Sequence, residues 1–305
     1  TEILPNPQLF VNMYVLKEAV LSSQIEGTQA SFSDVLGKVE DENDLDIGEV
    51  SNYADAMYYG LERLGSFPMS LRLIREIHAK LLKSGRGSDR SPGEFRSTQN
   101  WIGPPGCTLS NAIFIPPAPA DMDKSLSDLE LYFHDDTVLP VLIKIALIHA
   151  QFETIHPFLD GNGRVGRLLI TFWLCQQRVL NQPLLYLSYY FKENRTEYYD
   201  RLMAVRYEGD WEGWIKFFLK GIAEVSDEAT STAKEIIALK KQYEDDLNQR
   251  NASANMQKMV DYIFESPIFS IRDVEEKLGV SYPTASSLVT AFIECGYVED
   301  MTPYR

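Results

Sequence analysis

The sequence predicts an all-α protein that carries one small β-hairpin. Apolar residues recur at helical spacing in most segments of the 305-residue chain, and glycine or proline ends several of these segments. Only one stretch, between about 100 and 117, has the short turns and the β-favouring run of a hairpin. No apolar run approaches about 18 residues, so no membrane-spanning helix is expected.

The first part of the chain, residues 1–70, is expected to be an N-terminal helical region. Helical spacing of apolar residues predicts helices over 10–25, 50–64 and 70–82. Gly27 is a natural stop for the first of them, so Glu26 lies at its end, where the helix dipole disfavours an anion. Glu26 would therefore gain from a cationic partner. The acidic run from Glu40 to Glu49 contains few apolar residues and is expected to be a solvated loop.

The hairpin and further helices follow in the middle of the chain. Pro116 should end the hairpin, because proline cannot donate to a strand ladder. Beyond it, helices are predicted over 121–133, 140–155, from about 162 onward, and over 211–222. A long polar helix over 227–250 is expected to be a linker.

The stretch around which the chain is organised runs from His156 to Arg167. Pro157 disfavours the helical conformation at His156, so the preceding helix should end there and leave the imidazole facing a cleft. Gly161 and Gly163 allow a tight turn, and a helix that starts at about Asn162 would aim its unpaired N–H groups at the same point. That geometry suits an anion such as phosphate.

Three charged residues complete this candidate site. Arg164 and Arg167 are three residues apart and share one face of the predicted helix, where they can hold anions. Asp160 offers hard oxygen atoms just ahead of the glycines, where a magnesium ion shared with a nucleotide would lie. The stretch thus combines a base, a metal ligand, an oxyanion cradle and two arginines.

Three other interpretations compete with a phosphate site. The spacing Gly161-x-Gly163-x-x-Gly166 satisfies the dinucleotide-binding pattern, but that pattern needs a preceding strand, whereas a helix is predicted here. Glu153-x-x-His156, with His149 on the same face, has the spacing of a di-iron site, but no second matching pair follows. His149 is then expected to lie in the core or to support the site from behind. The two arginines could also form surface ion pairs.

The stretch from His156 to Arg167 resembles the Fic (Fido) signature, histidine-x-phenylalanine-x-acid-Gly-Asn-Gly-Arg-x-x-Arg, and matches it at each specified position. The resemblance implies a helical catalytic core over 71–224 that transfers AMP from ATP, with Mg²⁺, to a Ser, Thr or Tyr hydroxyl of a protein, including this chain itself. It implies that His156 is the general base. Asp160 would hold the metal, and Arg164 and Arg167 would orient the phosphates. Gly161, Asn162 and Gly163 would stabilise the developing charge through N–H groups and the Asn side chain.

Three further segments resemble parts of the same family. The run from Ser22 to Gly27 is similar to its inhibitory motif, which implies that Glu26 pairs with Arg167 and blocks the γ-phosphate. The hairpin resembles the family's flap, whose exposed edge aligns the target through main-chain hydrogen bonds. Its tip and edge would be Asn111, Ala112, Ile113 and Phe114. The run Asn194-Arg195-x-x-Tyr198-Tyr199 is similar to the segment that walls the adenine, which implicates Asn194, Tyr198 and Tyr199.

The chain closes with a linker over 225–251 and a separate domain over 252–305. Helical patterns and a turn at Gly279 predict a helix-turn-helix followed by the start of a wing, which resembles a winged-helix appendage. The domain has four cationic and eight acidic side chains, which give +4 and −8. The cations are Lys258, Arg272, Lys277 and Arg305. The acids are Asp261, Glu265, Asp273, Glu275, Glu276, Glu294, Glu299 and Asp300. The net of −4 disfavours DNA, because phosphate contacts need cations. A protein-contact or dimerisation module is predicted.

Composition bounds the function classes. A hydrophobic fraction of 45% and a charged fraction of 24% are ordinary for a globular protein, and the net charge of −15 weighs against a nucleic-acid or membrane binder. Three distant cysteines without a C-x-x-C pattern suggest free thiols, and no signal peptide is visible, so a cytoplasmic location is predicted. Within the same fold, removal of AMP or transfer of another phosphate-bearing group remains an alternative. A nucleotide-sensing transcriptional regulator, a homodimer, and nucleic-acid contact through the terminal domain also stay open.

Overall fold

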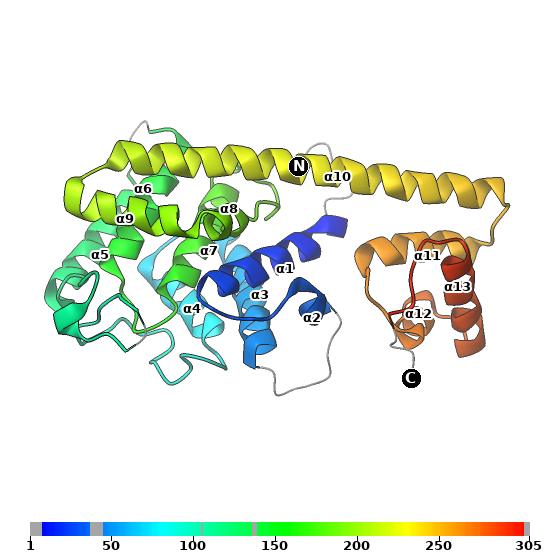
Figure 1. Ribbon diagram of the computed structural model, residues 1–305, viewed down its shortest axis with the longest axis horizontal. Helices are drawn as coiled ribbons and strands as arrows, with labels where there is room; N and C mark the ends of the chain where they lie inside the picture. The colour runs from blue at the N-terminus through cyan, green and yellow to red at the C-terminus, as the bar shows by residue number, and fades with distance from the viewer. Residues whose placement is uncertain (1–7, 37–44, 105, 136–138, 302–305) are drawn as a thin grey trace. The chain divides into compact units, whose positions relative to one another are not determined.

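The computed structural model describes residues 8–36, 45–104, 106–135 and 139–301, and these residues are built from helices without strands (Figure 1). The all-α class predicted from the sequence is confirmed. The α-helices, in order, are α1 Gln8–Ile25, α2 Phe32–Leu36, α3 Leu45–Leu64, α4 Leu71–Leu81, α5 Pro119–Phe133, α6 Val141–Ile155, α7 Asn162–Gln176, α8 Ser188–Glu193, α9 Arg195–Glu208, α10 Trp211–Gln249, α11 Ala254–Glu265, α12 Ile271–Leu278 and α13 Tyr282–Glu294.

Several helices begin or end at the capping residues, prolines and glycines that the sequence analysis predicted. Ser70 caps α4, and its side chain accepts a hydrogen bond from the backbone N–H of Leu73 at 3.3 Å. Pro140 stands at the N-terminus of α6, where its missing N–H costs nothing. Gly27 follows α1 with φ at +99°, a conformation that glycine adopts without strain. These ends place Glu26 and His156 at two neighbouring helix termini.

Two regions differ from the sequence prediction. Residues 45–49 of the acidic run do not form a solvated loop but begin α3, and Glu49 is buried; residues 40–44 lie outside the described part. The hairpin is reduced to a single antiparallel bridge between Ile102 and Phe114, next to a short 3₁₀-helix, η1, over Leu109–Asn111. Prolines on both sides of the bridge lack the N–H groups that a longer ladder would need.

Three α-helices were not predicted, α2, α8 and α9, and two helices predicted separately form a single helix. The aromatic cluster at 188–199 forms α8 and the start of α9. The helices predicted over 211–222 and 227–250 join into α10, because no proline or chain-breaking turn separates them. Gly221 lies inside α10 at a point where the ring of Tyr190 occupies the space that a Cβ would need, so a larger residue would collide with that ring.

The chain divides into two compact units, the larger formed mainly by residues 11–35 and 45–227 and the smaller mainly from residue 228 onward. At the centre of the larger unit, α7 packs against α3, α4 and α6. Close approach needs glycine at two points: a Cβ on Gly166 would lie 2.3 Å from Glu153 Oε1, and one on Gly60 would lie 2.3 Å from Phe172 Cζ. Within this unit, α7 is therefore held from three sides, with its N-terminus at the candidate site.

The smaller unit contains the predicted helix-turn-helix but no wing. α12 and α13 are joined at Gly279, whose φ is +63°, and a capping box of Ser270 and Asp273 begins α12. Val274, Ala285 and Phe292 pack in its core. Up to Met301 the described residues after α13 form no strand, so the prediction of a wing is not borne out over 296–301. The helices described here also include none that is both long and apolar enough to cross a bilayer.

The two glycines of α3 provide a test of the packing against α7. Gly60→Ala should lower the free energy of unfolding by about 1–3 kcal/mol, because the added methyl group collides with Phe172. Gly48→Ala is the matched control: a Cβ there meets nothing within 4 Å, and the change should stabilise by about 0.5–1 kcal/mol through helix propensity. Denaturant unfolding followed by tryptophan fluorescence reports the larger unit, which contains all four tryptophans. Equal stability of the two variants would contradict this account of α3 and α7.

Candidate active site

His156 ends α6 in a conformation that few residues adopt. Its φ of 49° lies in the left-handed region, which carries a conformational cost for a residue other than glycine. Neighbouring polar groups hold it there: the His156 carbonyl accepts hydrogen bonds from Arg96 Nε at 3.0 Å and from Asn100 Nδ2 at 3.1 Å. Arg96 is itself buried and also donates to the carbonyl of Pro117 at 2.6 Å. The backbone at His156 is therefore fixed by the segment that leads into the bridge at Ile102.

The imidazole of His156 is held in its neutral form. Burial and the nearby charge of Arg206 lower the pKa of His156 to about 4, and the Glu153 carbonyl and Glu26 oppose this shift. His156 lies at a helix C-terminus, where the helix dipole favours the imidazolium cation, and the sequence does not show what opposes this effect. In the structure, burial of the ring and the positive charge of Arg206 oppose it. A neutral imidazole near pH 7 can accept a proton.

The loop between His156 and α7 is closed by Asn162. Its side-chain oxygen accepts from the Phe158 N–H, and its amide donates to the Phe158 carbonyl, both at 2.8 Å. In this structure the Asn162 side chain is engaged with the loop backbone, and its contact with a ligand stays a prediction. Gly161 takes φ at +76° as the N-cap of α7, and no side chain caps the N–H groups of the first turn. These backbone N–H groups are the donors that an anion would find there.

His78, on α4, supports the loop from behind. Its Nδ1 accepts the N–H of Gly93 at 2.8 Å, so its Nε2 carries the proton and donates to the Asp160 carbonyl at 3.0 Å. The ring stacks on Phe158 with centroids 3.7 Å apart. Burial lowers the pKa of His78 to about 4, which keeps this tautomer neutral. The sequence contained no signal for this role beyond the scarcity of histidine.

Arg164 is a buried cation without close partners. Its side chain is 1% exposed, and none of its three guanidinium nitrogens has a hydrogen bond. Two carboxylates, Glu49 and Asp160, lie at 3.6 Å, which is within ion-pair range but beyond hydrogen-bond range. A buried guanidinium in this state costs free energy, and an anion that accepts its N–H groups would remove that cost. The geometry fits a phosphate.

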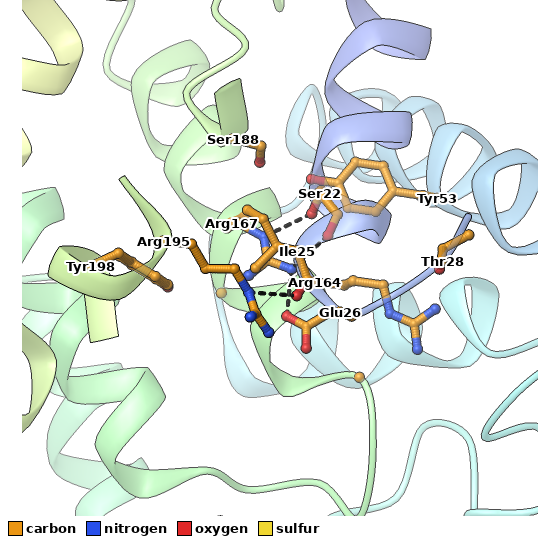
Figure 2. A network of polar contacts seen from close by, with 12 residues as sticks. Ser22, Ile25, Glu26, Thr28, Tyr53, Arg164, Arg167, Ser188, Arg195 and Tyr198 are labelled. Atoms are coloured by element: carbon orange, nitrogen blue, oxygen red, sulfur yellow. Dashed lines mark hydrogen bonds and ion pairs between the residues drawn. The ribbon is translucent and has the colours of Figure 1, made fainter. Parts of the chain in front are cut away.

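Arg167 has partners, and they come from α1 and the residue after it (Figure 2). Its guanidinium donates to Glu26 Oε1 at 2.7 Å, to Ser22 Oγ at 2.8 Å and to the Ser22 carbonyl at 3.0 Å. Burial disfavours ionised Glu26, but the charges of Arg167 and Arg164 outweigh it, so the pKa of Glu26 lies below its ordinary range. The structure therefore brings together Ser22, Glu26 and Arg167, as the sequence resemblance implied.

Glu26 also covers the start of α7. A Cβ on Gly163 would lie only 2.3 Å from Glu26 Oε1, so the carboxylate rests directly against the glycine at the second position of the helix. Negative charge is stabilised at a helix N-terminus. The carboxylate of Glu26 therefore lies where its negative charge is favoured.

Two more arginines hold the segment that carries Glu26. Arg195 Nε donates to the Ile25 carbonyl at 3.2 Å (Figure 2). Arg86 donates to the Glu26 carbonyl, also at 3.2 Å. Carbonyl groups at a helix C-terminus lack partners within the helix, and cations there are favourable. These contacts supply hydrogen-bond donors to two carbonyl groups at the C-terminal end of α1. Neither arginine was predicted to act at the site, although Arg195 lies within the quoted Asn-Arg-x-x-Tyr-Tyr run.

Asp160 offers a carboxylate that suits Mg²⁺. Its side chain is 35% exposed, and Oδ1 accepts the N–H of Gly161 at 2.6 Å. The described residues contain no group of three or more side chains that could hold a metal by themselves. Mg²⁺ commonly takes one or two carboxylates and completes its shell with phosphate oxygens and water. Asp160 therefore suits such an ion, provided that phosphate oxygens complete its shell.

The aromatic segment divides into a buried and an exposed part. Tyr198 is 1% exposed, and its hydroxyl hydrogen-bonds to His149 Nε2 at 2.9 Å. The structure therefore places Tyr198 in the core, and its contact with a nucleotide base stays a prediction. His149 is buried and bonds through Nδ1 to the Gly166 carbonyl, so it supports α7 from the core. Tyr199 is 36% exposed beside Arg195 and remains a candidate. The Asn194 amide is bonded to the Tyr190 carbonyl at 3.0 Å.

The predicted flap presents apolar side chains. Ile113 is 56% exposed, whereas Phe114 is buried beneath it, and Asn111 turns back to accept hydrogen bonds from Thr108. From Gln99 to Ala120 the chain has no charged residue, in a protein of net charge −15. This segment is therefore a neutral surface next to the His156 loop, to which Arg96 and Asn100 connect it.

The rival interpretations of the signature do not fit this geometry. A helix, α6, rather than a strand precedes the glycine pattern, as expected from the sequence. The di-iron alternative fails because His149 is engaged with Gly166 and Tyr198 and is not free to bind a metal. Two surface cavities of about 430 and 410 Å³ lie elsewhere on the larger unit, and neither is lined by a residue of the signature. The candidate site is therefore recognised by its buried arginines and their carboxylate partners, and not by a large cavity.

Two buried carboxyl groups lie near the site but outside it. Glu18, one turn before Ser22, accepts hydrogen bonds from Tyr53 and from the Ser188 N–H at 3.2 and 3.1 Å and thereby connects α1, α3 and α8. Burial raises the pKa of Glu18 to about 7, although Ser188 and Arg167 oppose the shift. Burial likewise raises the pKa of Glu153 to about 7.

Comparison with known families finds two matches along the chain. Residues 68–174 match the Fic/DOC family, and residues 1–62 match the Fic/DOC family N-terminal segment. The chain is 32% identical to a protein adenylyltransferase Fic of Culex quinquefasciatus over 49% of this chain and 27% of that protein. It is 29% identical to a protein of the same name from Nematostella vectensis over 57% of this chain and 37% of that protein. The chain thus spans about a third of the length of these two curated relatives.

Solved structures share the fold. A Fic family protein from Desulfovibrio desulfuricans G20 superposes with a TM-score of 0.64 at 21% identity and covers 96% of this chain and 83% of its own. A Fic domain containing signaling protein from Bacteroides thetaiotaomicron VPI-5482 superposes with a TM-score of 0.62 at 19% identity, over 76% of this chain and 92% of its own. At these identities the likeness concerns the fold.

The raised pKa of Glu18 predicts a pH dependence of stability. Because its folded pKa of about 7 exceeds the ordinary value of about 4.3, its contribution is fully present below about pH 4.3 and is lost as the pH rises through about 7. Glu18→Gln should therefore lose less free energy of unfolding than the wild type between pH 5 and 8, as measured by urea unfolding. Glu62→Gln, an exposed site on α3, should keep the wild-type slope. A wild-type slope in Glu18→Gln would contradict the assignment.

Proposed function

Because the chain belongs to the Fic/DOC family, we propose that it is a protein adenylyltransferase, which moves AMP from ATP to a hydroxyl group of a protein. We further propose that Glu26 keeps it inactive. The observation that supports both parts most strongly is the pair of buried arginines on one turn of α7. Arg164 lacks hydrogen-bond partners, and Arg167 is occupied by Glu26.

In the proposed reaction, the neutral imidazole of His156 accepts the proton of the target hydroxyl. The hydroxyl oxygen forms a bond to the α-phosphorus of ATP, and the bond from that phosphorus to the bridging oxygen of the β-phosphate breaks. Pyrophosphate then carries away the electron pair. The lowered pKa of His156 keeps the base free at neutral pH, and the left-handed backbone held by Arg96 fixes its position.

The start of α7 would bind the phosphates. The N–H groups of Asn162 and Gly163 would donate to the phosphate oxygens, and Arg164 would use its unpartnered N–H groups on the same chain of phosphates. Arg167 would also donate to the phosphate oxygens once the carboxylate of Glu26 has moved away from it. Mg²⁺ held by Asp160 would neutralise phosphate charge. Tyr199 is the residue best placed to line the base, because Tyr198 is buried.

The inhibition follows from competition for one cation. A γ-phosphate that reaches Arg167 must displace the carboxylate of Glu26, which lies 2.7 Å from the guanidinium and against Gly163. The pair is buried on the arginine side, where an ion pair is hard to replace without another anion. ATP would therefore bind in an unproductive way, or weakly, until the segment after α1 moves.

The role of His156 is tested by its removal. His156→Ala should reduce transfer of label from α-labelled ATP to protein by at least about 100-fold, since a general base typically contributes that much. His134→Ala, at an exposed histidine after α5, serves as the control and should transfer at the wild-type rate. Both assays are best run with Glu26→Gly present, so that the starting activity is measurable. Undiminished transfer by His156→Ala would rule out this mechanism.

The role of Glu26 is tested by releasing Arg167. Glu26→Gly should raise the transfer rate, and intact-mass spectrometry after incubation with ATP and Mg²⁺ should find adenylate on the protein or on proteins of a lysate. Glu208→Gly is the matched control, because Glu208 is exposed at the end of α9 and also precedes a helix-ending glycine. Adding Arg167→Ala to Glu26→Gly should remove the gain. If Glu26→Gly is no faster than Glu208→Gly, inhibition by Glu26 is excluded.

A further inference from the structure

Arg206 on α9 contacts the end of the helix that carries His156. Its NH2 group donates to the Glu153 carbonyl at 2.9 Å, and its Nε donates to Thr154 Oγ1 at 3.3 Å. Glu153 and Thr154 belong to the last turn of α6, where backbone carbonyls have no partner within the helix. A guanidinium placed here satisfies one of these carbonyls and complements the negative end of the helix.

The same residue also lies against the flap segment, Asn111–Phe114. The Arg206 guanidinium stands over the ring of Phe114, 4.2 Å from its centroid. The next residue, Tyr207, donates from its hydroxyl to the Ile113 carbonyl at 3.2 Å, and its ring meets Phe114 edge-on. Because the bridge to Ile102 is the only regular pairing of the flap in the described residues, these contacts from α9 are a large part of what holds it.

We propose that Arg206 is a positioning residue for the transfer reaction: it ties the last turn of α6, which leads into His156, to the flap segment, and Tyr207 supplies a second attachment. The proposal rests on the function proposed above. As a result, the distance and orientation between His156 and the flap segment would stay fixed. A proton transfer from a target hydroxyl bound at the flap to His156 requires such a fixed geometry.

The charge of Arg206 adds an electrostatic effect. Three charged groups face His156: Arg206 from α9, Arg96 from the segment before the bridge, and Glu26 from the end of α1. The two arginines favour the neutral imidazole, and Glu26 favours the cation. Withdrawal of Glu26 by itself would remove the charge that favours the imidazolium cation. A residue that served only to cap α6 would not need to affect either the flap or the imidazole.

The test uses the full chain and two measurements that need no activity. Titration of the histidine signals by NMR, with His156→Ala to assign the signal of His156, reports the pKa of that ring. Hydrogen exchange measured by mass spectrometry reports protection of the bridge amides at Ile102, Ile113 and Phe114. The variants are Arg206→Gln, Arg206→Lys and Tyr207→Phe. The control is Arg201→Gln, because Arg201 lies on the same helix in exposed ion pairs with Glu197 and Asp210.

Each variant has its own expected result. Arg206→Gln should move the His156 titration to higher pH and should speed exchange at the flap several-fold. Arg206→Lys keeps the charge but not the forked hydrogen bonds, so the titration should stay near that of the wild type while flap exchange rises. Tyr207→Phe should affect only the flap. Arg201→Gln should change neither measurement.

Kinetics in the Glu26→Gly background then separate this proposal from the proposed function. Arg206→Gln should move the acidic limb of the rate to higher pH. The rate on that limb should fall about tenfold whenever the pKa of His156 rises by one. If transfer is absent in every variant but the two structural readouts respond as expected, the proposed function fails and the positioning role stands. If Arg206→Gln matches Arg201→Gln in both His156 titration and flap exchange, the positioning role is overturned.

Discussion

The ion pair between Glu26 and Arg167, a residue in the second turn of α7, is the constraint on which the arrangement of the site depends. Arg167 is buried, and a buried cation needs an anion close by. Glu26 meets that need at 2.7 Å, and Gly163 provides the space for its carboxylate. For the carboxylate to reach this point, α1 must end beside α7, and Arg195 and Arg86 bind the carbonyls that this end exposes. The same pair thus connects the end of α1 to α7, at the position where we propose that a phosphate binds.

The two arginines of the signature differ in a way that bears on ligand binding. Arg164 and Arg167 are equally buried and lie one turn apart, yet only Arg167 has hydrogen-bond partners. The carboxylates of Glu49 and Asp160 neutralise Arg164 from a distance without accepting its N–H groups. Arg86 also pairs with Glu49, at 3.4 Å. The two arginines and two carboxylates of this cluster therefore have no net charge, which is compatible with a folded protein. This arrangement leaves unsatisfied donors that a phosphate would complete, which agrees with the function we propose.

The histidine at the centre of the site depends on residues that are distant in sequence. Its backbone is held by Arg96 and Asn100, about sixty residues upstream, and its protonation state by burial and by Arg206, fifty residues downstream. Its neighbour His78 shows the same principle: one ring nitrogen binds the Gly93 N–H and the other the Asp160 carbonyl, so the ring fixes the loop in place. Conformational strain at His156 is thereby offset by contacts outside its own segment.

The sequence alone determined the helical class, most helix ends, and the residues of the signature, because proline, glycine and capping residues act locally and a long motif identifies its chemistry. It also identified Ser22, Glu26 and Arg167 as partners through the resemblance. Only the tertiary structure decided that Tyr198 and the Asn162 side chain face inward, that Glu49 is buried and that the hairpin is a single bridge. It also revealed Arg206 and Arg96. These outcomes depend on which helices pack together, and the charge or burial of a side chain cannot be known until its neighbours from other parts of the chain are in place.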